Sequence, residues 1–513
     1  MSNIAVLLGT GLWGEDVLHK LPWITHLDTS HNVHVISRIN PDIHLDPAIQ
    51  QNFDSQFFSK VKESIQKLKN TSKTFDFVYD SDHLQKKYSQ QELDQVQSWL
   101  GVSFEFIASM DRRFFNSESH IDSRNPDGLT DNIAGLVTLY EEIFRKNNIT
   151  ILVNTLEDDI FSTIGYYVAK KMNIEIIGFV SGRFPKKGVM FCKDFKDIYY
   201  WNDTSAELDD IRRLYDDTTI AGKEKSEELL ENLKLRSMMK KAGGIDYVKK
   251  FNKMRDIAIK SYPHEANIFK KVNLYSAIKL FAYSQIRSRI ITLIFAKPDF
   301  KEKFYLFPLH YTEDAQITFR EPFLDQYTLI YEISRSLPHG YKLYIKPHPH
   351  FCGTDTSFRK LLKISRQQNI KIVSHLLSPI ELIRHAQGVI TINSTTGFEA
   401  LIMKKPVITF GHDFYCKEEI VTTIRDHNSF PEMLIKHIND TEQHEKEKKI
   451  NKFITRVYSN TIWITGCGDP FKAFELTDTD GKSIAIALNI IVRNTGAVPE
   501  RSTPLHDISL QAS

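Results

Sequence analysis

The sequence has little of what marks a secreted, membrane-spanning or disulfide-stapled protein. Its four cysteines (Cys192, Cys352, Cys416 and Cys467) are scattered over 513 residues without paired spacing. That spread argues against a disulfide scaffold or a structural zinc site and suits a reducing compartment. No stretch approaches the roughly 20 uncharged apolar residues that span a bilayer. The short N-terminal apolar run has no basic region before it, so it does not predict a secretory signal.

Charge of one sign is also lacking, because 66 Lys and Arg face 64 Asp and Glu. This balance lacks the clustered basic excess of a nucleic-acid-binding protein. Hydrophobic residues make up 41% and charged residues 25%, which is ordinary for globular domains and excludes a disordered, collagen-like or coiled-coil chain. The length favours two or three domains. We therefore expect a globular, cytoplasmic protein.

Residues 1–201 alternate short apolar runs with helical patterns, which indicates a parallel sheet covered on both faces. The expected strands are Ile4–Leu8, Val33–Ser37, Phe75–Tyr79, Ile149–Asn154 and Ile174–Val180, and the expected helices include Asp131–Lys146 and Ile160–Met172.

Charged helical patterns dominate residues 202–298, which we interpret as a helical connector. Within it, Ile268–Phe295 is basic and amphipathic. Such a segment is either a core helix with a solvated face or a helix that lies on an anionic membrane surface.

Residues 299–455 repeat the α/β rhythm and predict a second domain. Expected strands are Lys303–Pro308, Tyr341–Lys346, Ile370–Ser374, Gly388–Thr391 and Pro406–Phe410; expected helices are Pro322–Ser336, Ser357–Gln368, Ser378–His385, Gly397–Met403 and a polar one at Ser429–Lys449. In residues 456–513 the periodicity is weak after Gly468, and the polar end predicts a loose tail. Two doubly wound α/β domains favour a ligand cleft between them.

A Lys-Pro-His-Pro motif, from Lys346 to Pro349, directly follows one of these strands. The prolines end the strand and restrict the loop. His348 and Lys346 are thereby held at a carboxyl strand end, where both side chains can donate hydrogen bonds to phosphate oxygens. A histidine that only caps the loop is the alternative.

A hydroxyl-rich turn links another strand to a helix. Ser394, Thr395 and Thr396 precede Gly397 and Glu399. The amides at a helix start favour an anion, and the glycine allows a close approach of ligand to backbone. Glu399 either accepts hydrogen bonds from ribose hydroxyls or, at capping-box spacing from Thr396, caps the helix. Together the two motifs predict a phosphate held between His348 and the Ser394–Thr396 turn.

These motifs carry a family resemblance. Tyr305–Gly411, with its KPHP and INSTTGFEALIMKKPVITFG segments, resembles the capsule polysaccharide biosynthesis family, and Asn154–Phe191 is more weakly similar to that family's N-terminal segment. The family is similar to GT-B glycosyltransferases, including capsule Kdo transferases, and the paired motifs also resemble bacterial sialyltransferases that use CMP-sugars. The resemblance implies a GT-B-like fold, two Rossmann-like domains facing a cleft.

By this resemblance, His348, Ser394 and Thr395 bind the donor phosphate and Glu399 binds the nucleoside. His310 stands where the family usually has Gln, which leaves its role open. The sialyltransferase pattern has an acidic pair followed by Gly, whereas Glu157-Asp158-Asp159 is followed by Ile160. No catalytic base is therefore carried over from that pattern.

Glycosyl transfer still requires a means of activating the acceptor hydroxyl. Glu157, Asp158 and Asp159 follow an expected strand and qualify by position, and Asp111 is a further candidate. For phosphate or an acidic sugar, Arg112 (next to Arg113) and Arg183, after another strand, are the candidates. Helix capping by Asp158 or Asp159 and a surface pair of Arg112 and Arg113 are the alternatives.

Two weaker patterns compete. Gly9, Gly11 and Gly14 fit the dinucleotide-binding fingerprint after the first strand. Ser37-Arg38 stands where NAD-binding proteins have an acidic residue, and this pair would suit the 2′-phosphate of NADP. The glycines therefore predict either an NADP site or a turn on the acceptor side of a glycosyltransferase. Asp478-Thr479-Asp480 fits a metal motif of another glycosyltransferase fold but follows no convincing strand, and we attribute it to chance. We expect no metal and no cofactor.

The sequence therefore predicts a cytoplasmic GT-B-like glycosyltransferase of capsule or surface polysaccharide biosynthesis, in peripheral contact with the inner membrane. The expected partners are a nucleotide sugar, most simply CMP-linked, and a growing, lipid-linked oligo- or polysaccharide; no nucleic acid is expected. The alternatives are a UDP-sugar enzyme of the same fold (2-epimerase-like), an NADP-dependent oxidoreductase, and a non-catalytic polysaccharide export factor.

Overall fold

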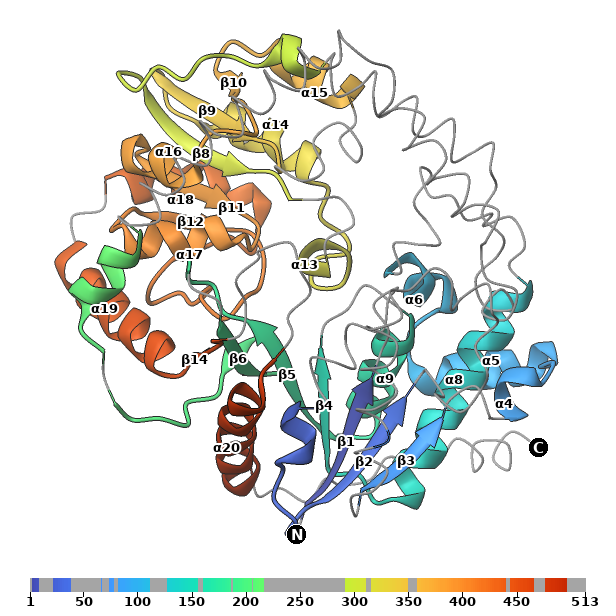
Figure 1. Cartoon of the computed structure of the whole chain (residues 1–513). Coiled ribbons are helices and arrows are strands. Elements are labelled where there is room, and N and C mark those ends of the chain that lie inside the picture. The colour runs from blue at the N-terminus through green and yellow to red at the C-terminus, as the bar shows by residue number, and fades with distance from the viewer. Residues whose placement is uncertain are drawn as a thin grey trace, which may run out of the picture.

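The computed structural model arranges the chain around two separate β-sheets with helices on their faces (Figure 1). It describes residues 2–8, 22–37, 66, 73–77, 82–110, 127–155, 160–185, 188–204, 206–215, 291–310, 315–348, 358–439, 443–465 and 476–495.

The first sheet has the strand order β14-β6-β5-β4-β1-β2-β3, and β7 pairs with β6. Its strands are β1 (Asn3–Leu8), β2 (Asn32–Ser37), β3 (Thr74–Phe77), β4 (Ile151–Thr155), β5 (Glu175–Ser181), β6 (Gly188–Lys193), β7 (Asp197–Ile198) and β14 (Ile462–Trp463). Strands β1 to β5 pair in parallel, whereas β6, β7 and β14 pair antiparallel. Its helices are α4 (Asp82–Gln85), α5 (Gln90–Leu100), α6 (Phe104–Met110), α8 (Asp127–Lys146), α9 (Ile160–Lys171) and α20 (Asp478–Asn494).

The second sheet has the order β10-β9-β8-β11-β12-β13, and its strands all pair in parallel. They are β8 (Lys303–Pro308), β9 (Tyr341–Lys346), β10 (Ile370–Ile372), β11 (Gly388–Thr391), β12 (Val407–Thr409) and β13 (Thr422–Thr423). The helical elements of this half are η3 (Ile291–Ile294), α13 (Ala315–Thr318), α14 (Gln326–Ser336), α15 (Phe358–Ser365), α16 (Pro379–His385), α17 (Thr395–Ile402), η4 (His427–Ser429), α18 (Phe430–Ile438) and α19 (Gln443–Ser459).

Both sheets bury apolar side chains on their two faces. In β1, Ala5 and Leu7 pack with α8 and α9, while Val6 and Leu8 pack on the opposite face with α20. In the second sheet, alternate residues of β8 divide in the same way between two core clusters. Continuous apolar strands are what a parallel sheet with helices on both faces requires. The expected fold class, two doubly wound Rossmann-like α/β domains, is confirmed.

The two halves share a hydrophobic core through the β5–β6 hairpin. In β6, Phe191 faces the core of the first sheet, whereas Met190 and Cys192 face a core cluster that also contains Phe304 of β8. Because this junction is apolar and buried, the first sheet is packed against the second half at this point. Because β5 and β6 are antiparallel and have no helix between them, a search of the sequence for alternating strands and helices does not predict this hairpin.

The C-terminal segment differs from expectation in two places. The polar stretch Ser429–Lys449 is two helices, α18 and α19, rather than one. The weak periodicity after Gly468 predicted no element, yet α20 forms there and buries Ile484, Leu488 and Ile491 against the first sheet. Residues 499–513, for which we predicted a loose tail, lie outside the described residues, as does most of the 202–298 connector, including 268–290.

Candidate functional site

The strand order of the second sheet reverses between β8 and β11, because the chain runs outward through β9 and β10 on one side and through β12 and β13 on the other. Ligands of doubly wound sheets bind beyond the carboxyl ends of the strands at such a switch point. His310 follows β8, His348 follows β9 and Ser394 follows β11. With neighbouring strands about 4.8 Å apart, the loops that carry the expected donor-binding residues share one edge.

The hydroxyl-rich turn forms the start of α17. Ser394 is the N-cap residue, and its Oγ accepts a hydrogen bond from the Thr396 amide at 3.3 Å. Its own amide donates to Thr391 Oγ1 at 3.1 Å, and the Tyr415 hydroxyl donates to its carbonyl at 2.6 Å. Three hydrogen bonds therefore fix the conformation of the turn. The helix start directs partial positive charge outward, beside the hydroxyls of Ser394 and Thr395.

Glu399 does not cap this helix. With Ser394 at the N-cap, the third helical residue is Gly397, so the capping-box alternative from Thr396 is wrong. Among the described residues, the Glu399 carboxylate makes no hydrogen bond or ion pair. Burial raises its pKa to about 7, against the opposing effect of the positive charges of Lys346 and Arg183. Near neutral pH it is therefore partly ionised, and both of its forms can accept hydrogen bonds from ribose hydroxyls.

Lys346 and His310 are both buried beside this edge. Lys346 ends β9, and its ammonium donates a hydrogen bond to the His375 carbonyl at 3.1 Å. The backbone of His310 is clamped by Gln326, whose side chain accepts from its amide at 3.1 Å and donates to its carbonyl at 3.2 Å. The loop after β8 is thus fixed by α14. His348 is partly buried two residues beyond β9.

Gly397 has a packing role. A Cβ at this position would lie 2.6 Å from the Tyr415 hydroxyl and 2.9 Å from Cγ2 of Thr391. The space that glycine leaves free is therefore filled by protein atoms. This corrects the expectation that the missing side chain admits a ligand to the backbone.

Arg183 of the first domain reaches the donor turn of the second. It follows β5, and its guanidinium donates a hydrogen bond to Thr395 Oγ1 at 3.0 Å and lies 3.5 Å from the Asp413 carboxylate. Asp413 also pairs with Arg320. The sequence predicted Arg183 as a candidate but missed Arg320 and Asp413. The position of Asp413, four residues beyond the end of β12, was the available signal.

These contacts bring the carboxyl ends of both sheets together. Arg183 comes from the end of β5, Thr395 from the end of β11 and Asp413 from the end of β12. In Figure 1 the parallel strands of the lower sheet, such as β1, β2 and β4, accordingly point toward the upper domain.

The remaining candidates lie outside the described residues: Glu157, Asp158, Asp159, Asp111, Arg112, Gly9, Gly11 and Gly14. The strands that precede two of these groups in the sequence are described. They are β1, before Gly9, and β4, before Glu157, and they pair at the switch point of the first sheet. The roles proposed for these residues stay predictions.

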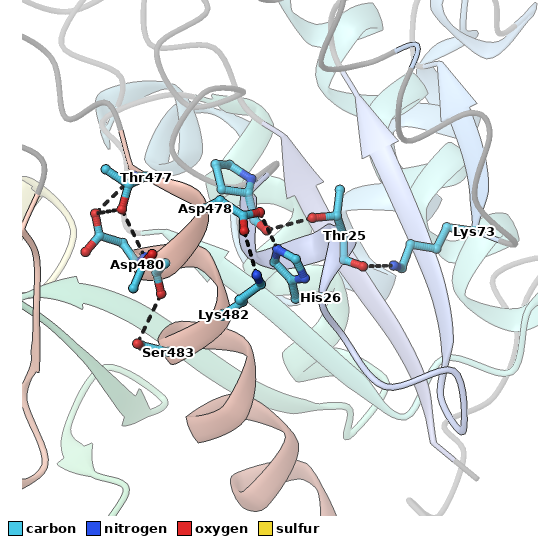
Figure 2. Close-up of polar contacts among 10 residues, drawn as sticks. Thr25, His26, Lys73, Thr477, Asp478, Asp480, Lys482 and Ser483 are labelled. Atoms are coloured by element: carbon cyan, nitrogen blue, oxygen red, sulfur yellow. Dashed lines mark hydrogen bonds and ion pairs between the residues drawn. The ribbon is translucent and has the colours of Figure 1, made fainter.

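The Asp478-Thr479-Asp480 triplet is a helix start whose carboxylates have partners (Figure 2). Asp480 completes a capping box with Thr477 and accepts hydrogen bonds from the amide and hydroxyl of Thr465 at 3.0 and 2.9 Å. Asp478 pairs with His26 at 2.6 Å and with Lys482 at 2.8 Å. Within the described parts of the chain, no three His, Cys, Asp or Glu side chains are grouped to hold a metal ion.

The second sheet carries a family signature. Residues 234–432 match the family model described as capsule polysaccharide biosynthesis protein. Over 122 residues the chain is 35% identical to the capsule polysaccharide export protein KpsS of Escherichia coli, covering 22% of this chain and 31% of that protein. Over 74 residues it is 31% identical to the capsule polysaccharide modification protein LipA of Neisseria meningitidis serogroup B, covering 14% and 10%. The expected resemblance to the capsule polysaccharide biosynthesis family is confirmed.

The matches span about a third or less of the length of these two relatives. Among solved structures, the chain resembles the β-Kdo 2,7 transferase KpsC of Thermosulfurimonas dismutans at 13% identity and a TM-score of 0.31, covering 79% of this chain and 98% of that one. The chain also resembles a UDP-N-acetylglucosamine 2-epimerase of Methanocaldococcus jannaschii at 12% identity and a TM-score of 0.25, covering 88% of this chain and 99% of that one. In the described part of this chain, no helix has the length and apolar character to cross a lipid bilayer.

Proposed function

We propose that the protein is a glycosyltransferase of capsule or surface polysaccharide biosynthesis that uses a nucleotide sugar, most simply a CMP-linked one. The observation that carries the proposal is the shared edge at the switch point of the second sheet. There His348 follows β9, and the Ser394–Thr396 turn and Glu399 follow β11; these two parallel strands flank β8, within the region that matches the capsule family. The positive helix start suits a phosphate, and Glu399 suits a ribose.

In the proposed reaction, the bond between the sugar and the donor phosphate breaks while an acceptor hydroxyl bonds to the sugar. The phosphate gains charge as it leaves, and the α17 amides, His348 and Lys346 stabilise that charge. The acceptor proton passes to a carboxylate beyond β4, for which Glu157, Asp158 and Asp159 are the candidates. The acceptor is a growing, lipid-linked glycan at the cytoplasmic face of the membrane.

A polysaccharide-binding role without catalysis is the second candidate, because the Escherichia coli relative is named as an export protein. Nucleotide binding separates the two. The non-catalytic candidate has no need of a site for a donor nucleotide, whereas a transferase must bind the donor and release its nucleotide.

Thermal unfolding with CMP, CDP, UDP, GDP and NADP tests the proposal. A ligand at 100 times its Kd adds about 2.7 kcal/mol of stability, so we expect CMP to raise the Tm by several degrees and NADP to leave it unchanged. The shift should disappear in His348→Ala. It should persist in His385→Ala, a matched control because His385 is exposed and precedes β11 at the opposite edge of the sheet. No response to any nucleotide would overturn the enzyme proposal, and a response to NADP alone would favour the glycine-rich turn.

A further inference from the structure

A buried cluster of charged side chains joins the two domains beside the α17 start. Asp413, whose side chain is 1% exposed, lies between Arg320, at 7%, and Arg183, at 18%. Arg320 belongs to the segment that follows α13, and Arg183 belongs to the β5–β6 hairpin. The cluster therefore draws one arginine from each domain onto a single carboxylate.

The charges of this cluster do not balance. Within ion-pair distance, two guanidinium groups share one carboxylate, and the Nε of Arg320 and the Oδ2 of Asp413 are both buried without a hydrogen-bond partner. Glu321, the nearest acid in sequence, is already bonded to the amide and ring of His412. An uncompensated charge in a buried cluster is unfavourable, so the cluster favours an additional anion. Arg320 offsets the charge of Asp413, and Glu399, which is only partly ionised near neutral pH, offsets the charge of Arg183 in part.

The positive charge of Arg183 lies at the start of α17. The hydrogen bond from Arg183 to Thr395 Oγ1 places its guanidinium beside the first residue of α17. The positive end of the helix and the guanidinium therefore act on the same space. Arginine binds phosphate oxygens through paired N–H groups, which gives both charge and geometry.

Arg183 is anchored before any ligand arrives. The neighbouring Phe184 is buried against Phe398 of α17, with ring centroids 5.3 Å apart, and against Tyr458 and Trp463 at 5.2 and 5.6 Å. The Gly182 amide donates a hydrogen bond to the Gly188 carbonyl at the base of the hairpin. The hairpin is fixed by this apolar junction, and Arg183 already contacts Thr395. A large hinge movement is therefore not needed to bring Arg183 to the start of α17.

We propose that Arg183 is a ligand of the donor phosphate, preassembled across the domain boundary, and that Asp413 and Arg320 position it. The donor site is then built by both domains rather than by the second alone. This inference rests on the proposed function and adds a phosphate ligand supplied by the first domain. In the absence of donor, Thr395 and Asp413 hold the guanidinium in the place where it meets the phosphate.

Titration calorimetry with CMP and cytidine tests this role, because the two ligands differ only in the phosphate. In Arg183→Gln we expect CMP to bind at least tenfold more weakly while cytidine binds as in the wild type. Arg183→Lys, which keeps a point charge, should recover part of the loss. Arg320→Gln should also weaken CMP selectively, because Asp413 then neutralises Arg183.

Arg212→Gln is the matched control. Arg212 is a comparably buried arginine that contacts the opposite end of α17 through the Ile402 carbonyl, so the ratio of CMP to cytidine affinity should stay unchanged. If Arg183→Gln binds CMP and cytidine with the wild-type ratio of affinities while His348→Ala loses CMP binding, the role of Arg183 is overturned and the proposed function stands. Absence of CMP binding by the wild type would overturn both. A parallel loss of cytidine binding would show a structural role and would likewise overturn the inference.

Discussion

The starts of α17 and α20 look alike in sequence and differ in their chemistry. Each follows a hydroxyl cap, Ser394 or Thr477, and each has a carboxylate within its first turns. At α20 both carboxylates have hydrogen-bond or ion-pair partners (Figure 2). At α17 the Glu399 carboxylate makes no such bond to a described residue, and the arginines nearby outnumber the one acid that they pair with. Satisfied polar groups stabilise the fold, whereas unbalanced ones leave room for a ligand.

Replacing Asp480 should have the largest effect on stability. Asp480 is 2% exposed and accepts hydrogen bonds from the amide and hydroxyl of both Thr465 and Thr477, so Asp480→Ala removes the acceptor that these four donors share. We expect a loss of about 3 kcal/mol in urea unfolding, without a change in CMP affinity. If Asp480→Ala is as stable as the wild type but no longer binds CMP, the start of α20 binds the ligand and our assignment of a purely structural role to it is wrong.

Glu399→Gln should change how stability depends on pH. The Glu399 pKa is about 7 in the folded protein against 4.5 without burial, so the folded state retains the proton that the unfolded state releases. This group's stabilising contribution is therefore complete below about pH 4.5 and is lost as the pH rises to about 7, a decrease of up to about 3 kcal/mol.

Because the amide cannot ionise, Glu399→Gln should remove this decrease and unfold at a higher urea concentration than the wild type at pH 8. Urea midpoints measured from pH 5 to pH 8 check it. Parallel pH profiles for the two proteins would show that Glu399 titrates at its ordinary pKa and would remove the contrast with α20.

Asp478→Ala should have the smallest effect. Asp478 is exposed, and its pairs with His26 and Lys482 are screened by solvent. We expect an unfolding midpoint indistinguishable from that of the wild type and unchanged binding of CMP. Loss of activity on addition of a chelator, reproduced by Asp478→Ala, would instead assign a metal to this triplet.

Much of the second domain could be predicted from sequence. The strands Lys303–Pro308, Tyr341–Lys346 and Gly388–Thr391 have the expected bounds, because apolar runs between helical patterns are strong local signals. The start of α17 was placed two residues late, since its threonines suggested a turn. The β5–β6 hairpin and α20 were missed because their burial depends on partners distant in sequence.

The same limit applies to the candidate site. His348, Lys346 and the Ser394–Thr396 turn were predictable because each follows a strand and the strands share an edge. Arg320 and Asp413 were not, because their pairing joins loops about ninety residues apart. The packing role of Gly397 was also hidden, since the Tyr415 ring that fills its space comes from the loop after β12.

A crystal structure with bound CMP tests the central claim most directly. We predict the phosphate at the start of α17, within hydrogen-bond distance of Arg183 and of the Ser394–Thr396 turn, with the ribose near Glu399. CMP bound at the glycine-rich turn of residues 9–14 or at the start of α20, with the α17 start empty, would contradict the account.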